Sequence, residues 1–206
     1  MAQWVQKASS FSGEFKSVEG SDTVFQLAQY AAMYLAATRE GAAAKKWGDL
    51  AQTLSTVRTV GRWTGMLDTG LWVLSEAQHP SERDPVAQGL QMGRAVSIWV
   101  YYPLEHLWFL DSIGLIKLRD GAWYSRASCK MWGLYIALTL LQVLYKAYRS
   151  GRVPTEASLI DFTKNLCDFP LSIHWSLQDG CLSDRASAIL GIAGSLIQVA
   201  NRWLRL

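Results

Sequence analysis

Cysteine, proline and charged residues are all scarce in this chain of 206 residues, which contains 3 Cys and 5 Pro and is 18% charged. A globular protein carries about 25% charged residues. Three cysteines without a C-x-x-C pair exclude a disulfide framework and favour a reducing, cytosol-facing compartment. The formal net charge of +3 is spread along the chain without a basic arm, so no nucleic acid partner is expected.

Sequence motifs of the common enzyme classes are also missing. The chain contains no G-x-S-x-G, H-E-x-x-H, P-loop or Rossmann glycine pattern. Cys167, His174 and Cys181 recur every seven residues, but Pro170 and Gly180 interrupt any helix that would align them, and no fourth zinc ligand is evident. We therefore expect no metal, no other cofactor and no catalytic residues, and a protein that is not an enzyme.

Hydrophobic residues, by contrast, make up 50% of the chain and include 10 Trp and 8 Tyr. The rings of Trp and Tyr are amphipathic and concentrate where an apolar phase meets water. The composition excludes a disordered chain and indicates a membrane protein. Residues 1–16 lack the continuous apolar core of a secretory signal, so we expect the chain to reach its membrane after synthesis.

The apolar residues follow a helical period and the signals for strands are weak, so we predict an all-α fold. This fold is a membrane-associated helical bundle with an amphipathic interfacial helix and apolar C-terminal helices. The expected parts are a flexible N-terminal arm (1–20), an N-terminal helical region with the amphipathic helix (21–78), a hinge loop (79–88) and an apolar helical region (89–206).

Several residues predict where individual helices begin and end. Thr23 and Gln26 have the spacing of a capping box, so the first helix should begin just after Thr23. Thr155 and Ser183 are the expected caps of the last two helices. The helix that follows Thr155 should stop before Pro170.

Three apolar segments in the C-terminal region are candidates for crossing a membrane. They cover residues 95–116, 131–145 and 186–201. Fifteen helical residues cover about 22 Å, short of a bilayer core of about 30 Å, but flanking Lys, Arg and Trp side chains extend such spans. Buried helices of a soluble bundle would show the same pattern. Basic residues on both sides of each segment leave the orientation open.

Residues 43–65 form the most informative segment. On a helix their apolar side chains make a stripe about 80° wide that is bordered by cations. We expect this helix to lie in the membrane plane, with the stripe in the acyl boundary and the cations on the phosphates of anionic lipids. A bundle helix with an ordinary core-facing stripe is the alternative. The predicted membrane-binding residues are Trp47, Leu50, Leu54, Val57, Lys46, Arg58 and Arg62.

A second candidate site lies in the first apolar segment. A carboxylate beside an imidazole in an apolar helix is typical of a proton relay. Adjacent helical residues point about 100° apart, however, so Glu105 and His106 cannot pair with each other. We expect Glu105 to bind a basic partner as a helix-packing contact, and a pore-lining role is the alternative. The expected packing motif is Tyr102, Pro103, Leu104, Glu105 and His106.

The final apolar segment has small residues at three- and four-residue spacing. Such residues allow the backbones of two helices to approach closely inside a bilayer. We expect self-association or internal packing through Ala188, Gly191 and Gly194.

Taken in order, these segments resemble the peroxin-11 family, the peroxisomal membrane proteins that proliferate and elongate peroxisomes before fission. The resemblance covers residues 23–204. The stretches that carry it are Ala28-Gln29-Tyr30-Ala31, the run LSTVRTVGR from Leu54 to Arg62, Tyr102-Pro103-Leu104-Glu105-His106 followed by Leu115, Asp168-Phe169-Pro170-Leu171 with His174-Trp175, and Gly191-Ile192-Ala193-Gly194.

The resemblance implies a peroxisomal membrane protein with both termini in the cytosol. It also implies homo-oligomers and a membrane-remodelling amphipathic helix, which corresponds to residues 43–65. Implied partners are the fission machinery and the import receptor for peroxisomal membrane proteins. The C-terminus lacks the dilysine tail of some relatives, so a role in coat recruitment is in doubt.

Three functions remain open at this point. The first is a non-enzymatic protein that controls peroxisome proliferation, size and number by inserting its amphipathic helix into the cytosolic leaflet. The second is a non-selective pore for small metabolites, lined by Glu105, His106 and Asp111. The third is a soluble helical protein whose stripe binds a groove on a partner. We favour the first.

Overall fold

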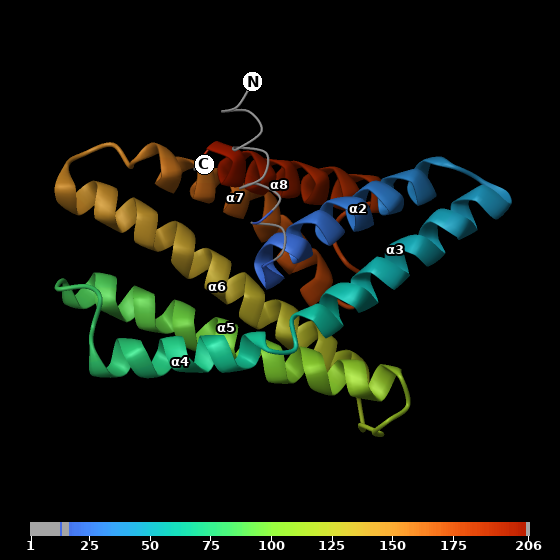
Figure 1. The fold of residues 1–206 in the computed structure, drawn as a ribbon, viewed down its shortest axis with the longest axis horizontal. Coiled ribbons are helices and arrows are strands. Elements are labelled where there is room, and N and C mark those ends of the chain that lie inside the picture. Colours follow the sequence, from blue (N-terminus) through green and yellow to red (C-terminus); the bar gives the residue numbers. More distant parts are fainter. Residues whose placement is uncertain (1–12, 14–16, 205–206) are drawn as a thin grey trace. The chain divides into compact units, whose positions relative to one another are not determined.

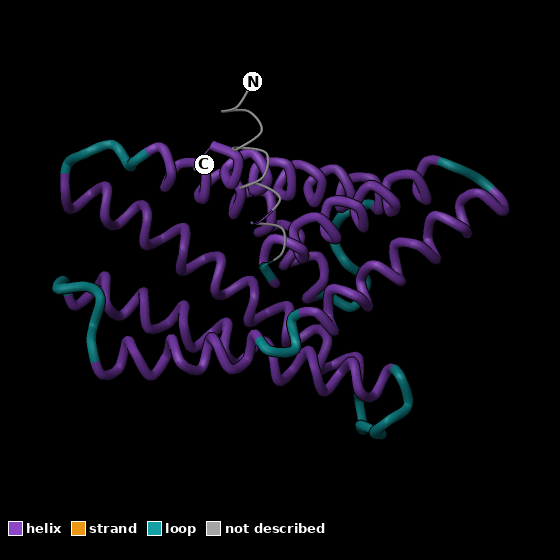
Figure 2. The backbone as a smooth tube through the Cα atoms, in the orientation of Figure 1, coloured by secondary structure: helices purple, strands orange, loops and turns teal. Residues whose placement is uncertain are grey.

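The computed structural model describes residue 13 and residues 17–204, and the regular structure of this part is helical (Figures 1 and 2). The all-α prediction is therefore confirmed. The helices are α2 (Val18–Thr38), α3 (Gly41–Gly61), α4 (Gly65–Gln78), α5 (Pro85–Ser112), α6 (Gly121–Ser150), α7 (Glu156–Ser176) and α8 (Asp184–Leu204). Most of the predicted N-terminal arm lies outside the described residues.

Helix α2 begins earlier than the capping box predicted. Ser17 is the N-cap, and its hydroxyl accepts the amide of Gly20 at 3.0 Å. Thr23 and Gln26 therefore lie inside α2, where both are buried. The prediction that the helix begins after Thr23 was wrong, because an earlier serine already caps one of the free amides of the first turn.

Two helices continue through a proline. Pro103 lies inside α5 and Pro170 inside α7, which ends only at Ser176. The prediction that this helix stops before Pro170 was therefore wrong. A proline removes one helical hydrogen bond, and contacts with neighbouring helices can offset that loss. The caps were predicted correctly, since Thr155 accepts the amide of Ser158 and Ser183 accepts the amide of Ala186.

The chain divides into two compact units. In the first, which contains residues up to Arg62 and from Leu182 onward, α2 packs against both α3 and α8. In the second, residues 63–181, α4 packs on α5, α5 on α6 and α6 on α7. Within the second unit, residues 79–84 of the predicted hinge (79–88) connect α4 to α5, and residues 85–88 form the first turn of α5.

Burial in this fold is inverted relative to a soluble protein. The buried side chains of the described residues are more often polar than apolar, and Asp168 and Ser172 are among the most deeply buried. Large apolar side chains lie on the surface of every helix. A soluble protein buries its apolar residues and seldom buries acids, so this arrangement suits an apolar solvent.

One helix of the described residues, α6, is long and apolar enough to cross a membrane. It contains the predicted segment 131–145. Only 22% of its most apolar window is buried inside the protein, whereas the core helix of a soluble protein is mostly buried. The other two apolar segments lie mainly in α5 and in α8, which do not meet the same criterion.

Candidate membrane-binding surface

The predicted stripe lies on α3, beside the face that packs on α2. Ala51 and Thr59 are the buried residues of α3. Trp47, Leu50 and Val57 are 37%, 42% and 41% exposed, although they are large and apolar. Leu54 is half-buried. The structure thus leaves most of the stripe at the surface of the chain, and its contact with a membrane stays a prediction.

The three predicted cations of α3 have different surroundings. Lys46 is exposed. Arg58 binds Asp22 of α2 through two nitrogens, Nε at 2.9 Å and Nη2 at 3.2 Å, and also donates to the amide oxygen of Gln29 at 2.7 Å. Arg62 reaches the same aspartate at 3.3 Å. Both arginines thus hold α3 against α2, and their contact with lipid phosphates stays a prediction.

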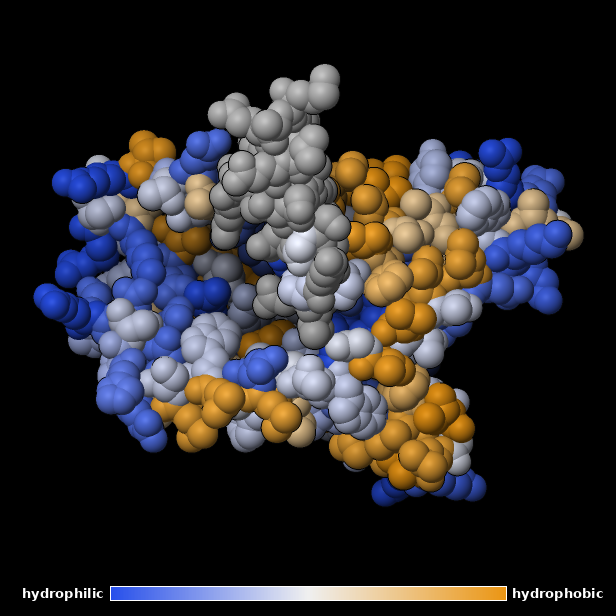
Figure 3. All heavy atoms as spheres, viewed as in Figure 1, coloured by the Kyte–Doolittle hydropathy of each residue, from blue (hydrophilic) through white to orange (hydrophobic). Residues whose placement is uncertain are grey.

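Helix α4 carries a second apolar stripe, which the sequence reasoning missed. Leu67, Leu71 and Leu74 are 64%, 66% and 56% exposed, more than the residues of the α3 stripe. Figure 3 shows apolar side chains on the surface of this helix. The spacing of four and three residues was the available signal, but the apolar neighbours of these leucines in the sequence concealed it.

The opposite face of α4 meets α5 at two glycines. A Cβ atom at Gly65 would lie 2.6 Å from the ring of Tyr102, and one at Gly70 would lie 3.1 Å from the indole nitrogen of Trp99. Real side chains almost never come as close as the first distance. These glycines therefore let two large rings of α5 rest against the backbone of α4.

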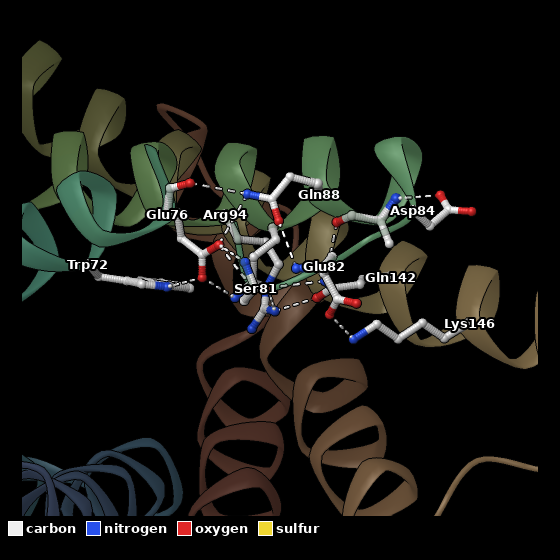
Figure 4. A network of polar contacts seen from close by, with 11 residues as sticks. Trp72, Glu76, Ser81, Glu82, Asp84, Gln88, Arg94, Gln142 and Lys146 are labelled. Atoms are coloured by element: carbon white, nitrogen blue, oxygen red, sulfur yellow. Dashed lines mark hydrogen bonds and ion pairs between the residues drawn. The ribbon is translucent and has the colours of Figure 1, made fainter. Parts of the chain in front are cut away.

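A buried carboxylate completes the contact between α4 and α5 (Figure 4). Glu76, 5% exposed, accepts hydrogen bonds at 2.9–3.2 Å from four residues. A buried charge is tolerated only when it is paired or well hydrogen-bonded, and five donor groups meet that need. The donors belong to Trp72, Ser81, Gln88 and Gln91.

Arg94 extends the same network from α5 to α6. Its Nε donates to the hydroxyl of Thr139 at 2.9 Å, and its Nη1 donates to the amide oxygens of Gln91 and Gln142. Gln91 donates in turn to Glu76. The network thus links three helices, and the Gln91 amide stands between a buried carboxylate and a guanidinium. Arg94 directly precedes the predicted apolar segment 95–116, and the sequence reasoning assigned it no role.

Charged pairs close the end of the bundle where α4 turns into α5. Glu82 binds Lys146, and Asp84 lies 3.4 Å from Arg149. Asp84 is also the N-cap of α5, where it accepts the amides of Val86 and Ala87. The pKa of Asp84 is lowered from its usual value of 3.8, chiefly by the hydrogen bond from the Ala87 amide and then by the Tyr145 hydroxyl.

The predicted packing motif lies in the C-terminal half of α5. It begins at Tyr102, which contacts the first residue of α4, and continues away from α4. Glu105 and His106 are both buried. The Tyr101 hydroxyl donates to Glu105 one turn away. The His106 ring stacks on the indole of Trp63, with centroids 4.3 Å apart and planes 16° from parallel. Glu105 thus has a partner within α5 and His106 has one in the turn before α4. The basic partner expected for Glu105 and the role of the motif in joining helices stay predictions.

Asp111 has a local structural role. Its Oδ1 accepts the amide of Leu118 at 2.8 Å, and a Cβ atom at Gly121 would overlap its other carboxylate oxygen. Asp111 therefore closes the loop between α5 and α6.

The small residues of α8 face α2 within the same chain. Ala188, Gly191 and Gly194 are all buried. A Cβ atom at Gly191 would lie 2.3 Å from the ring of Tyr30, so the tyrosine rests directly on the α8 backbone. Of the two roles considered for this face, the contact seen here is internal packing.

The residues once considered as zinc ligands make a turn instead. Nδ1 of His174 accepts the amide of Cys181 at 2.9 Å, and Gly180, with φ of +65°, lies against the imidazole. Within the part of the chain that the structure describes, no group of three His, Cys, Asp or Glu residues is arranged to hold a metal.

Comparison with known proteins places these features in a family. The Peroxisomal biogenesis factor 11 (PEX11) family matches residues 11–158, well over half of the chain. An uncharacterised protein of Schizosaccharomyces pombe is 31% identical over 120 residues, which are 56% of this chain and 59% of that protein. No solved structure matches. The match over most of the chain shows that it belongs to the PEX11 family of peroxisomal membrane proteins, which are peroxisome biogenesis factors.

Proposed function

We propose that this protein elongates the peroxisomal membrane ahead of fission by inserting the α3 stripe into the cytosolic leaflet. The α3 stripe consists of Trp47, Leu50, Leu54 and Val57. Membership of the PEX11 family supports the role in peroxisome proliferation. The exposure of Trp47, Leu50 and Val57 on a helix of a membrane protein is the observation that carries the proposed mechanism.

Insertion would be shallow, because the side of α3 next to the stripe is held on α2. Arg58 and Arg62 bind Asp22, and Ala51 is buried. A helix that fills only the headgroup and upper acyl region of one leaflet expands that leaflet relative to the other and bends the membrane. Exposed Lys46 adds attraction to anionic lipids, worth about 1 kcal/mol near the surface.

Self-association would concentrate these insertions on one part of the membrane. We propose homo-oligomers in the peroxisomal membrane with both termini in the cytosol. There the fission machinery can be recruited to the curved region. The import receptor for peroxisomal membrane proteins would deliver the chain.

Tubulation of vesicles by the full-length protein tests this mechanism. Leu50→Asp with Leu54→Asp should abolish tubulation of phosphatidylcholine and phosphatidylserine vesicles. Each change loses roughly 1.5–3 kcal/mol of apolar burial and puts a charge in the acyl boundary. Gln52→Asp with Thr56→Asp is the matched control, because both residues are exposed on the opposite side of α3. Equal tubulation by the two double variants would refute insertion of the stripe.

A further inference from the structure

The α4 stripe (Leu67, Leu71 and Leu74) has no role in the proposed insertion of α3. Its three side chains are more than half exposed, and the rest of α4 is bound to α5 by glycine contacts and the Glu76 network. What covers this stripe depends on how deep α4 lies in the membrane compared with the candidate span α6. Contacts within the second unit determine at which level of α6 the helix α4 lies.

The contacts of α4 set its register on α5. Near the start of α4, Gly65 meets Tyr102, and near its end Glu76 accepts from Gln91 at 3.1 Å. Gly70 meets Trp99 between them. The two helices therefore run antiparallel, and α4 lies alongside residues 88–102 of α5.

The contacts of α5 set its register on α6 in the same way. Arg94 donates to Thr139, and Gln91 accepts from Gln142 at 3.1 Å. A Cβ atom at Gly93 would touch Leu138. These helices are also antiparallel. Continued along α5, the same register brings Tyr102 level with about residue 131 of α6.

Combining the two registers places α4 level with the apolar middle of α6. The stretch from Gly65 to Glu76 is about 18 Å long and, through α5, lies level with residues 131–142. Residues 131–145 of α6 contain no charged side chain. The charged pairs of Glu82 with Lys146 and of Asp84 with Arg149 come only beyond this level.

We infer that α4 lies inside the acyl-chain layer, packed on α5 and level with the middle of α6, with Leu67, Leu71 and Leu74 in direct contact with lipid. This inference rests on α6 crossing the membrane. A helix of 14 residues is too short to cross alone, and its contacts with α5 hold it at that depth. Glu76 can lie there because its five hydrogen-bond donors all come from the protein.

Charge distribution favours lipid over a protein partner as the covering of this stripe. After Asp68 in its first turn, α4 has no exposed charged residue. The exposed residues of α5 up to Ser112 are all uncharged as well. Beside the stripe, exposed charge is limited to Asp68 and exposed polar groups to Ser75 and Gln78. This is less than the charged rim that gives a protein interface its specificity, whereas acyl chains need no such rim.

Site-directed spin labelling of the full-length protein in phosphatidylcholine and phosphatidylserine vesicles tests this inference. Single cysteines replace Leu67, Leu71 or Leu74 in a background in which the three native cysteines are serine. The labels report collision rates with oxygen, which concentrates in acyl chains, and with a water-soluble nickel chelate. Leu141→Cys on the exposed side of α6 is the lipid reference, and Arg83→Cys in the connection after α4 is the water reference.

We expect the three α4 labels to behave like Leu141→Cys, with a high oxygen rate and a low nickel rate. Nickel rates like that of Arg83→Cys would overturn the inference, while a lipid-like Leu141→Cys would leave membrane residence intact. Low rates for both reagents at α4 would mean that protein covers the stripe, which also overturns it. A water-like Leu141→Cys would show that α6 does not cross, and membrane residence would fail with the inference.

Discussion

Gly191 shows how a single absent side chain sets the packing of α8 on α2. The ring of Tyr30 occupies the space that a Cβ atom would need, at 2.3 Å. Gly191→Ala should therefore destabilise the protein by about 1–3 kcal/mol, since the ring or the helix must move. Thermal unfolding in detergent, followed by helical circular dichroism, measures this change.

Gly48 provides the control for that substitution in the same unit. It lies inside α3, and nothing would come within 4 Å of an added Cβ atom. Gly48→Ala should leave stability unchanged or raise it by up to about 1 kcal/mol, because alanine is the better helix former. Equal destabilisation by both variants would mean that helix propensity, and not contact with Tyr30, decides the effect at Gly191.

Asp84 gives the connection between α4 and α5 a dependence on pH. Its folded-state pKa lies below the usual 3.8, so its contribution to stability is complete above that value and declines as the pH falls through and below it. We expect hydrogen exchange in the first turn of α5 to quicken as the pH falls below about 4, after correction for intrinsic rates.

Asp84→Asn separates the charge from the helix cap. Asparagine is an equally good N-cap, so the start of α5 should keep its protection at neutral pH. The acid-induced loss of protection should disappear, since asparagine does not titrate in this range. If the variant kept the acid dependence of the parent, another group would have to be responsible.

At the scale of elements, Glu76 decides whether α4 stays on α5. Glu76→Ala leaves several donors without an acceptor, each at a cost of about 1–3 kcal/mol where it remains buried. Amides of α4 should then exchange faster with deuterium, while those of α6 keep their protection. Ser75→Ala, at the exposed neighbouring position, should have no such effect. Unchanged exchange in α4 of the Glu76 variant would show that the glycine contacts alone hold the helix.

The elements also show how far sequence reasoning reaches. Helical periodicity and cap residues are local, so the all-α class and the caps Thr155 and Ser183 could be predicted. The Glu76 network was missed because its donors include Gln88 and Gln91, which meet it only after α4 folds back on α5. The rule that a helix stops before a proline also misplaced the end of α7. This helix continues through Pro170 and packs against α6.

In the candidate site, too, local features could be predicted from the sequence, whereas contacts between helices could not. The α3 stripe could be read from spacing along one helix. The binding of Arg58 and Arg62 to Asp22 could not, because it requires knowing that α2 packs beside α3. For the same reason, the sequence left open whether Gly191 served self-association or internal packing.

At the scale of the whole molecule, the two units have different surfaces. The first contains the α3 stripe beside a face held on α2. The second contains the candidate span α6 and a polar interior surrounded by apolar side chains. The proposed function assigns anchoring to the second unit and leaflet insertion to the first, so substitutions in the stripe should alter membrane shape without releasing the protein from the membrane.

Peroxisome length in cells that lack the endogenous protein tests this account most directly. The full-length chain, the Leu50→Asp with Leu54→Asp variant and the Gln52→Asp with Thr56→Asp control would be expressed at equal levels. The account predicts that all three reach peroxisomes, that parent and control produce elongated peroxisomes, and that the stripe variant leaves them short and round. Elongation by the stripe variant equal to that by the parent would contradict it.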